Sequence, residues 1–315
     1  MGFLLLFLPV VLVLALKLYA KLSCGMCRCR TSMEGKVIVI TGANSGIGFE
    51  TAKDLARRKG RVILACRDPE RGQRAADEIT KMTENGDVVF RQLDLSSLDS
   101  VRRFASLINS TEKRLDVLIH NAGMSAPEGL HLTKDDLELQ FATNHFGPFL
   151  LNHLLLDLMK RSAPSRIVVV SSVTHHWATL DLDNLNFEKY IRNPYWVYCS
   201  TKLANLLFVR ELADRLKSTG VTVNALHPGG VRTSITRNAQ WYIKYLFVPV
   251  FYFFLKDCEK GAQTTIHLAV SNDVEGISGK YFADCKEAWT SPWARNAKKA
   301  KMLWQISEKF TGIVE

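Results

Sequence analysis

The sequence predicts an α/β fold in which one doubly wound parallel sheet of the Rossmann type forms a single domain. From Lys36 onward, short apolar runs rich in β-branched residues alternate with amphipathic stretches of helical period. Such alternation is typical of a parallel sheet that is covered by helices on both faces. Right-handed crossovers then wind the sheet in both directions from its centre. A length of 315 residues is sufficient for one such domain with a short N-terminal segment.

The expected elements follow one another with short connections. Six apolar runs are expected to be strands, and the stretches between them to be helices. The strand candidates are residues 37–41, 62–66, 88–93, 117–119, 167–170 and 221–226, and the helix candidates are residues 46–58, 69–81, 97–108 and 135–160.

An uninterrupted apolar stretch from Phe3 to Leu16 precedes this domain. As a helix with snorkelling lysines at its end, residues 2–22 would reach about 31 Å, the thickness of a bilayer's hydrocarbon core. Basic residues follow the stretch and none precedes it, which argues against a cleaved signal peptide and favours a cytosolic body. Residues 1–22 are therefore expected to be a membrane anchor. The alternative is a luminal enzyme, which a glycan on the Asn109 sequon would support.

Of the net charge of +10, +4 lies in the first tenth of the chain, next to this anchor. Lys17, Lys21, Arg28 and Arg30 all precede the first acidic residue, Glu34. An anionic membrane is therefore a better partner for this chain than a nucleic acid.

The seven cysteines do not form the pattern of a secreted disulfide framework. Cys24, Cys27 and Cys29 lie in a basic linker, residues 23–35, without the fourth ligand of a structural zinc site. We expect reduced thiols and no metal, and acylation of Cys24, Cys27 or Cys29 stays open.

Residues 241–255 break the alternation, because they are almost wholly aromatic and aliphatic. They are too few for a membrane span. We expect a buried helix or an apolar lid, with partial insertion into the membrane interface as the alternative.

The turn after the first predicted strand has the glycine spacing of a phosphate cradle. Gly42 permits the tight turn, Gly46 the close approach of a pyrophosphate, and Gly48 close packing of helix on strand. The helix that begins there would present free N–H groups to the anion. The residues expected to form the cradle are Gly42, Asn44, Ser45, Gly46, Ile47 and Gly48.

The end of the second strand bears on the choice between NADP and NAD. Arg67 occupies the place where an NAD enzyme typically has an acid for the ribose 2′-hydroxyl. A guanidinium suits a 2′-phosphate, so NADP is the favoured cofactor. Asp68 follows directly and keeps NAD as the less favoured alternative.

Tyr198 and Lys202 lie one helical turn apart, on one face. Upstream, an apolar run ends at Ser171 and Ser172. A phenol that is made acidic by a neighbouring ammonium can exchange a proton with an alcohol or a carbonyl. Ser172 would hold the developing oxyanion, and Ser171 is its rival because successive strand residues face opposite sides. The adjacent His175 and His176 are expected to be solvated and to have no role.

From Lys36 to about Cys285 these motifs resemble the short-chain dehydrogenase/reductase family. The resemblance implies that Asn144, Ser172, Tyr198 and Lys202 form a catalytic tetrad, with Asn144 supporting a water near Lys202. It also implies cofactor contacts from further residues, although His120 stands where a second Asn is usual. These residues are Asp94 and Leu95 at the adenine, Asn121 and Gly123 after the fourth strand, Tyr198 and Lys202 at the nicotinamide ribose, and Pro228, Gly229 and Thr233 near the carboxamide.

Within the family the chain is most similar to the membrane-anchored retinol dehydrogenase branch. The similarity lies in residues 65–68, 171–176 and 198–205 and in the long interval from Ser172 to Tyr198. It implies an enzyme that interconverts a lipophilic alcohol and its aldehyde or ketone. With Arg67 and the anchor taken into account, we expect an NADP(H)-dependent enzyme at a membrane, the endoplasmic reticulum, with its catalytic domain facing the cytosol. The most favoured substrate pair is retinol and retinal, and the alternatives are steroid, fatty or isoprenoid carbonyls. The substrate would contact Ser172. A homo-oligomer is compatible with the sequence. The rival function is a non-catalytic, cofactor-sensing membrane protein that retains the fold.

Overall fold

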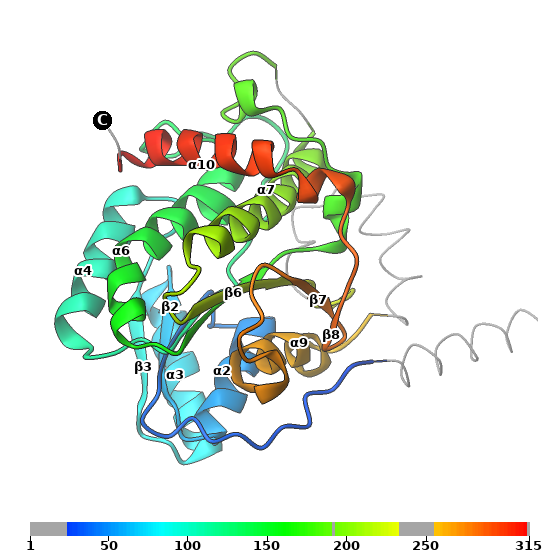
Figure 1. The fold of residues 1–315 in the computed structure, drawn as a ribbon. Helices are drawn as coiled ribbons and strands as arrows, with labels where there is room; N and C mark the ends of the chain where they lie inside the picture. Colours follow the sequence, from blue (N-terminus) through cyan, green and yellow to red (C-terminus); the bar gives the residue numbers. More distant parts are fainter. Residues whose placement is uncertain (1–23, 191–192, 233–254, 314–315) are drawn as a thin grey trace, which may run out of the picture.

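Two layers of helices enclose one central sheet in the computed structural model, which describes residues 24–190, 193–232 and 255–313 (Figure 1). The strands lie in the order β3-β2-β1-β4-β5-β6-β7-β8, and all neighbours are parallel except β7 and β8. The strands are β1 (Val37–Thr41), β2 (Arg61–Cys66), β3 (Val88–Gln92), β4 (Val117–His120), β5 (Ser165–Val170), β6 (Val221–Leu226), β7 (Tyr281–Ala283) and β8 (Lys286–Glu287). This confirms the expected doubly wound parallel sheet.

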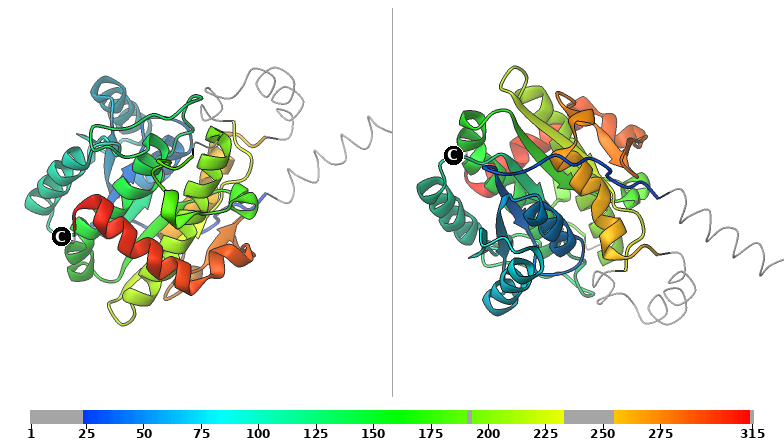
Figure 2. Two further views of the ribbon diagram at one scale, coloured as in Figure 1. Left: turned by 90° about the horizontal axis from the view of Figure 1, so that it is seen from above. Right: turned by 90° about the horizontal axis from the view of Figure 1, so that it is seen from below.

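The helices divide between the two faces of the sheet, as the views from above and below also show (Figure 2). One layer contains α2 (Gly46–Arg57), α3 (Pro69–Thr83) and α9 (Cys258–Val270). The other contains α4 (Leu98–Thr111), α6 (Gly147–Arg161), α7 (Pro194–Arg215) and α10 (Ala297–Thr311).

Alternate side chains of each strand supply the two cores. In β1, Val37 and Val39 pack with the α4, α6 and α7 layer, whereas Ile38 and Ile40 pack with the α2 and α9 layer. All four are buried, as expected for a parallel sheet whose two faces are both covered.

The expectation of one helix over residues 135–160 is wrong. Asp136 has a positive φ of 56°, and Leu132 pairs with Glu138 in an antiparallel bridge, so residues 132–138 form a turn. The Glu138 carboxylate then accepts a hydrogen bond from the Phe141 N–H and caps a new helical start. The helical segment consists of α5 (Leu139–Phe141), the π-helix η1 (Ala142–Phe146) and α6.

The C-terminal third contains elements that the alternation of runs did not predict, namely β7, β8, α9 and α10. Helix α10 packs across α7 and α6, with the Trp304 ring 4.8 Å from Phe149 and 5.9 Å from Phe208 between ring centroids. This contact covers the outer face of α7, which carries Tyr198 and Lys202, and part of α6.

The expected basic linker, residues 23–35, is hydrogen-bonded to the domain and packs against it. The Cys27 N–H donates to Gln263 of α9, the Arg58 guanidinium donates to the carbonyls of Cys29 and Thr31, and Met33 is buried. The expected anchor, residues 1–22, and most of the expected lid, residues 241–255, lie outside the described residues. Within the part of the chain that the structure describes, no helix combines the length and apolar character of a membrane span.

Candidate active site

The chain reverses its direction of winding between β1 and β4, and the carboxyl ends of these strands bring the glycine turn against the Asn121 segment. The Thr41 hydroxyl accepts hydrogen bonds of 3.0 Å from the N–H groups of both Asn121 and Ala122. The Asn121 amide donates to the Thr41 carbonyl at 2.9 Å and to the Gly42 carbonyl at 3.3 Å. These bonds hold the floor of the crevice in which ligands of this architecture bind.

The glycines of the expected cradle lie in a tight, crowded turn. Gly42 and Gly46 have φ of 67° and 63°, in the left-handed region. A Cβ on Gly48 would lie 2.5 Å from the Asn121 amide nitrogen and 2.6 Å from the Gly42 carbonyl oxygen. The turn therefore has no room for side chains at its base.

Helix α2 begins at this turn without a side-chain cap. Its N-cap residue, Ser45, accepts no capping hydrogen bond, and its first turn contains no acid. By contrast, Asp68 caps α3 and Asp257 caps α9. The free N–H groups and the positive end of the helix dipole fit a bound pyrophosphate. The cradle therefore fits a dinucleotide, with Asn44 and Ile47 in the same turn.

The second strand delivers Arg67 to the surface beside this crevice. Arg67 is exposed, and its carbonyl accepts a hydrogen bond from the Gln92 amide. The Asp68 carboxylate accepts from the Arg71 N–H as the cap of α3. The carboxylate is thus engaged locally, whereas the guanidinium of Arg67 lies in solvent.

Two further predicted cofactor residues, Asp94 and Leu95, follow β3. The Asp94 carboxylate accepts from the N–H and the hydroxyl of Ser96, at 3.0 and 2.6 Å. Leu95 is buried, and its carbonyl packs so tightly against Gly147 that a Cβ there would lie 2.2 Å away. This contact fixes the end of β3 against the start of α6.

The loop after β6 contains Pro228 and Gly229. Gly229 has a φ of 86°, and its N–H donates to His227 Nδ1 at 2.9 Å. The Lys256 side chain packs against it, since a Cβ on Gly229 would lie 3.0 Å from the Lys256 Nζ. Thr233, the third residue expected in this loop, lies outside the described residues.

Ser172, Tyr198 and Lys202 come together where the end of β5 meets the first half of α7. The Ser172 hydroxyl lies close enough to the Tyr198 hydroxyl to lower the pKa of that phenol. The Lys202 ammonium lies 5.5 Å from the Tyr198 ring centroid and donates to the Val170 carbonyl at 3.0 Å. A Cβ on Gly123 would lie 3.2 Å from that ammonium, so the β4 turn reaches the same place.

Ser171, the rival oxyanion donor, is engaged elsewhere. Its hydroxyl donates to the Lys202 carbonyl at 2.8 Å and is buried. The Ser172 hydroxyl accepts from the Thr174 N–H at 3.2 Å, which leaves its own proton free to donate. Ser172 is thus the serine whose hydroxyl meets the phenol.

The electrostatics of the pair differ from the simple expectation. Burial raises the pKa of Tyr198, and the hydrogen bond from Ser172 only partly opposes this. Burial also lowers the pKa of Lys202 to about 8. Burial thus opposes the expected acidification of the phenol by the ammonium. Tyr198 is therefore protonated at neutral pH.

Asn144 lies in the π-helix η1 and is fully enclosed. Its amide nitrogen donates to the Met124 carbonyl at 2.9 Å and to the Thr201 hydroxyl at 3.1 Å, and its oxygen accepts from the Met124 N–H. These bonds join the β4 turn to α7 next to Lys202. A π-helical turn is often found at functional sites.

His175 is a site residue that sequence reasoning missed. It is fully buried, and burial lowers its pKa to about 4. Its Nδ1 donates to the Ser172 carbonyl at 2.7 Å, and its Nε2 accepts from the Ser291 N–H at 3.4 Å. The expectation that this residue is solvated is wrong, because the C-terminal segment around Ser291 covers it. Only the proximity of His175 to Ser172 in the sequence could have suggested this.

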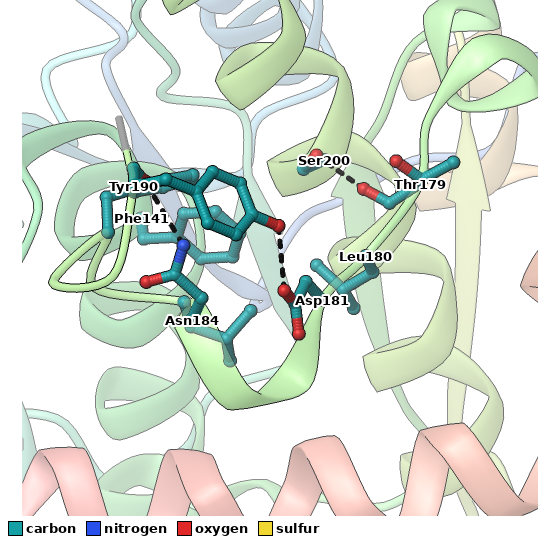
Figure 3. A pocket seen from close by; sticks show the side chains of 9 residues that line it. Phe141, Thr179, Leu180, Asp181, Asn184, Tyr190 and Ser200 are labelled. Carbon is teal, nitrogen blue, oxygen red and sulfur yellow. Dashed lines mark hydrogen bonds between the residues drawn. The ribbon is translucent and has the colours of Figure 1, made fainter. Parts of the chain in front are cut away.

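A small hollow that is open to solvent lies beside α7, next to Ser200 (Figure 3). The Tyr190 hydroxyl donates to Asp181 at 2.7 Å, and the Ser200 hydroxyl donates to the Thr179 carbonyl at 2.7 Å. None of the candidate catalytic residues lines it, so it is separate from the site. Its lining residues are Phe141, Thr179, Leu180, Asp181, Asn184, Leu185, Phe187, Tyr190 and Ser200.

Comparison with known proteins agrees with this geometry. A family model described as short chain dehydrogenase matches residues 36–242. Retinol dehydrogenase 12 of Bos taurus is 49% identical over 290 residues, which are 92% of this chain and 90% of the relative. Retinol dehydrogenase 11 of Homo sapiens is 46% identical over 312 residues, covering 98% of this chain and 96% of the relative.

Solved structures share the architecture. An uncharacterised protein from Mycobacterium paratuberculosis is similar with a TM-score of 0.73 and 35% identity, over 90% of this chain and 95% of that chain. The NADP active-site complex of RhlG from Pseudomonas aeruginosa has a TM-score of 0.63 and 26% identity, over 80% of this chain and 95% of that one.

Proposed function

The chain belongs to the short-chain dehydrogenase family, in its retinol dehydrogenase branch, and from this membership we propose that it interconverts a lipophilic alcohol and its carbonyl with NADP(H). Retinol and retinal are the leading pair. The observation that carries the proposal is the meeting of Ser172, Tyr198 and Lys202 at the end of β5, beside a crevice that fits a dinucleotide.

The residues divide the work as follows. A bound nicotinamide would supply or accept the hydride. The Tyr198 hydroxyl gives its proton to the carbonyl oxygen during reduction and takes it back from the alcohol during oxidation. Ser172 donates a hydrogen bond to the oxygen as charge develops there. Lys202 holds positive charge beside the phenol, and Asn144 fixes the turn that packs against Lys202.

The direction of the Tyr198 pKa favours reduction. Burial keeps the phenol protonated at neutral pH, which is the form that a carbonyl substrate needs. Oxidation needs the phenolate, which burial disfavours. We therefore propose carbonyl reduction as the favoured direction near neutral pH.

The preference for NADP rests on Arg67 and Asp68. Arg67 is exposed beside the crevice, where a guanidinium can bind a 2′-phosphate. Asp68 caps α3, so its carboxylate is already engaged by a backbone N–H. NAD is the less favoured cofactor.

The proposal also covers the segments that lie outside the described residues. Residues 1–22 would anchor the enzyme in a membrane, the endoplasmic reticulum in the first instance, with residues 36–315 as the catalytic domain on the cytosolic side. Residues 241–255 would form an apolar lid. Both features suit a substrate that partitions into bilayers.

The test is NADPH oxidation with retinal by the wild type and by Tyr198→Phe. We expect turnover by the wild type and a loss of about 10²–10⁴-fold in the variant, since the proton donor is removed. Equal rates would remove Tyr198 from the mechanism. A wild type that turns over neither retinal nor another apolar carbonyl would favour a non-catalytic role.

A further inference from the structure

Three tryptophans on neighbouring surface segments have more than half of their side chains exposed. Trp177 is 58% exposed, Trp289 is 62% exposed and Trp293 is 52% exposed. Trp177 ends the short helix η2 (Val173–Trp177), which begins directly after Ser172, and Trp293 lies in η7 (Pro292–Arg295). We refer to Trp177, Trp289 and Trp293 as the aromatic rim. A group of exposed indoles is unusual on a soluble surface and marks an interaction site.

Ring contacts connect the segments that carry the rim. The Trp289 ring stacks on His176, the neighbour of Trp177, with centroids 5.2 Å apart and planes at 9°. The Arg295 guanidinium lies 5.2 Å from the Trp289 centroid. The rim therefore runs from the residues after Ser172 to the start of α10.

Cations are interleaved with these rings. Arg295 and Lys298 are exposed, and the Lys299 ammonium lies 5.9 Å from the Trp293 centroid. The first turn of α10 contains no acid, although a helix N-terminus favours negative charge. Lysines at this end therefore gain no stabilisation from the helix dipole, and Lys299 instead donates a hydrogen bond to the Leu180 carbonyl.

The described chain begins on the same side of the molecule. The Gly25 N–H donates to Asp284 at 3.2 Å, in the turn between β7 and β8. Strand β8 ends at Glu287, two residues before Trp289. Both the side view and the view from below place the first described residues next to β8 (Figures 1 and 2). The apolar sequence of residues 3–16 thus joins the domain close to the rim.

Indoles interleaved with Lys and Arg are the composition of protein surfaces that lie at a membrane interface. The ring occupies the headgroup region, and each cation is attracted to anionic lipids. From this composition and from the point where the apolar N-terminal sequence enters the domain, we infer that the aromatic rim, with Arg295 and Lys298, docks the catalytic body on an anionic bilayer. Docking places Ser172 beside the lipid from which an apolar substrate enters. The inference rests on the proposed membrane anchoring.

Lipid quenching of tryptophan fluorescence tests this orientation in the full-length protein. The protein is reconstituted in phosphatidylcholine/phosphatidylserine vesicles (7:3) whose phosphatidylcholine has brominated acyl chains. The W177F/W289F/W293F variant keeps aromatic rings but removes the three reporters, so the difference from the wild type isolates the rim. We expect fractional quenching about twofold greater in the wild type, because indoles at the interface approach the bromines.

Charge reversal provides the matched comparison. R295E/K298E should lose the quenching of the rim tryptophans by lipid. Each cation near an anionic surface changes the partitioning of that surface onto the bilayer by roughly fivefold. K81E/K113E, an equal change on α3 and after α4, should leave it unchanged. R295E/K298E should also keep wild-type NADPH oxidation in detergent, because neither residue belongs to the candidate catalytic set.

The outcomes separate this inference from the proposed function. Vesicle flotation tests the anchor, and NADPH oxidation in detergent tests the activity. The protein could float and turn over retinal, yet show equal quenching in the wild type and the W177F/W289F/W293F variant. That result would overturn only the docking of the aromatic rim on the bilayer. In that case residues 233–254 or a second copy of the chain would be the occupant. A protein that does not float would overturn both the anchor and the docking.

Discussion

The Nδ1 of His175 lies 2.7 Å from the carbonyl oxygen of Ser172, and the ring is wholly buried. Because a carbonyl can only accept, Nδ1 carries the proton, and Nε2 of the neutral ring accepts from the Ser291 N–H. The imidazole thus ties the backbone of a candidate catalytic serine to the segment that leads into α10. We interpret His175 as a positioning residue, which acts through Ser172.

Substitution at His175 should separate positioning from packing. Asn places its amide where Nδ1 stands and can keep the bond to Ser172, whereas Gln places its amide where Nε2 stands. We therefore expect kcat to fall about tenfold in His175→Gln and to stay within about threefold of wild type in His175→Asn, consistent with a bond worth about 1 kcal/mol. Steady-state kinetics and Tm are measured together. If kcat instead follows Tm in both variants, the role of His175 is structural only.

Lys202 is expected to reduce the stability of the free protein. It is 2% exposed, and burial lowers its pKa from 10.5 to about 8. The unfolded chain therefore binds the proton more tightly, at a cost of about 3 kcal/mol below pH 8 that is relieved between pH 8 and 10.5. Lys202→Met removes this cost but leaves the Val170 carbonyl without its donor, which costs about 1–3 kcal/mol.

We accordingly expect Lys202→Met to be inactive yet as stable as the wild type, or up to about 2 kcal/mol more stable, at pH 7. The wild type should gain stability relative to the variant as the pH rises from 8 to 10. Denaturant unfolding at several pH values measures the difference in unfolding free energy between the wild type and the variant. The other titrating groups contribute equally to both proteins and therefore cancel. A gap that does not change with pH would show that Lys202 has an ordinary pKa in the folded protein.

Arg67 should determine which dinucleotide is preferred. Arg67→Ala removes a guanidinium that would bind the 2′-phosphate, so the KM for NADPH should rise at least about tenfold while the KM for NADH stays unchanged. NADH is the internal control, because it lacks that phosphate. Equal changes in both KM values would place Arg67 away from the 2′ position.

The sequence predicted the sheet more completely than the site, for physical reasons. Strands buried on both faces must be largely apolar, so β1, β2, β4, β5 and β6 were recognisable from local composition. The turn at Asp136 could not be predicted because the residues around it are compatible with a helix. The bridge between Leu132 and Glu138 depends on tertiary structure, which local sequence does not show. His175 was misjudged because its covering residue, Ser291, lies 116 positions away in the chain.

Gly48 should be intolerant of even one added carbon. A Cβ there would meet the Asn121 amide nitrogen at 2.5 Å, in the floor of the crevice, and the Gly42 carbonyl oxygen at 2.6 Å, in the cradle. We expect Gly48→Ala to lose about 1–3 kcal/mol of stability and most of its affinity for NADPH. Gly86→Ala is the control, because a Cβ at Gly86 meets nothing within 4 Å. Unfolding and NADPH fluorescence titrations measure both, and wild-type affinity in Gly48→Ala would contradict the cradle.

The two directions of the reaction should respond differently to pH. Reduction needs the neutral phenol of Tyr198, and oxidation needs the phenolate. Burial raises the pKa of that phenol and the Ser172 hydrogen bond lowers it only partly, so the phenolate is scarce at neutral pH. The kcat for retinol oxidation should therefore rise about tenfold per pH unit from pH 7 towards pH 10, whereas kcat for retinal reduction should stay nearly level over that range.

Single-turnover rates in each direction measure this contrast without interference from product release. Ser172→Ala removes the bond that stabilises the phenolate, so it should lower oxidation further and leave the slope with pH intact. If wild-type oxidation instead reaches its plateau below pH 8, the positive charge of Lys202 and of the bound oxidised cofactor outweighs the burial of Tyr198. The phenol would then be acidified only in the complex, and oxidation would proceed readily at neutral pH.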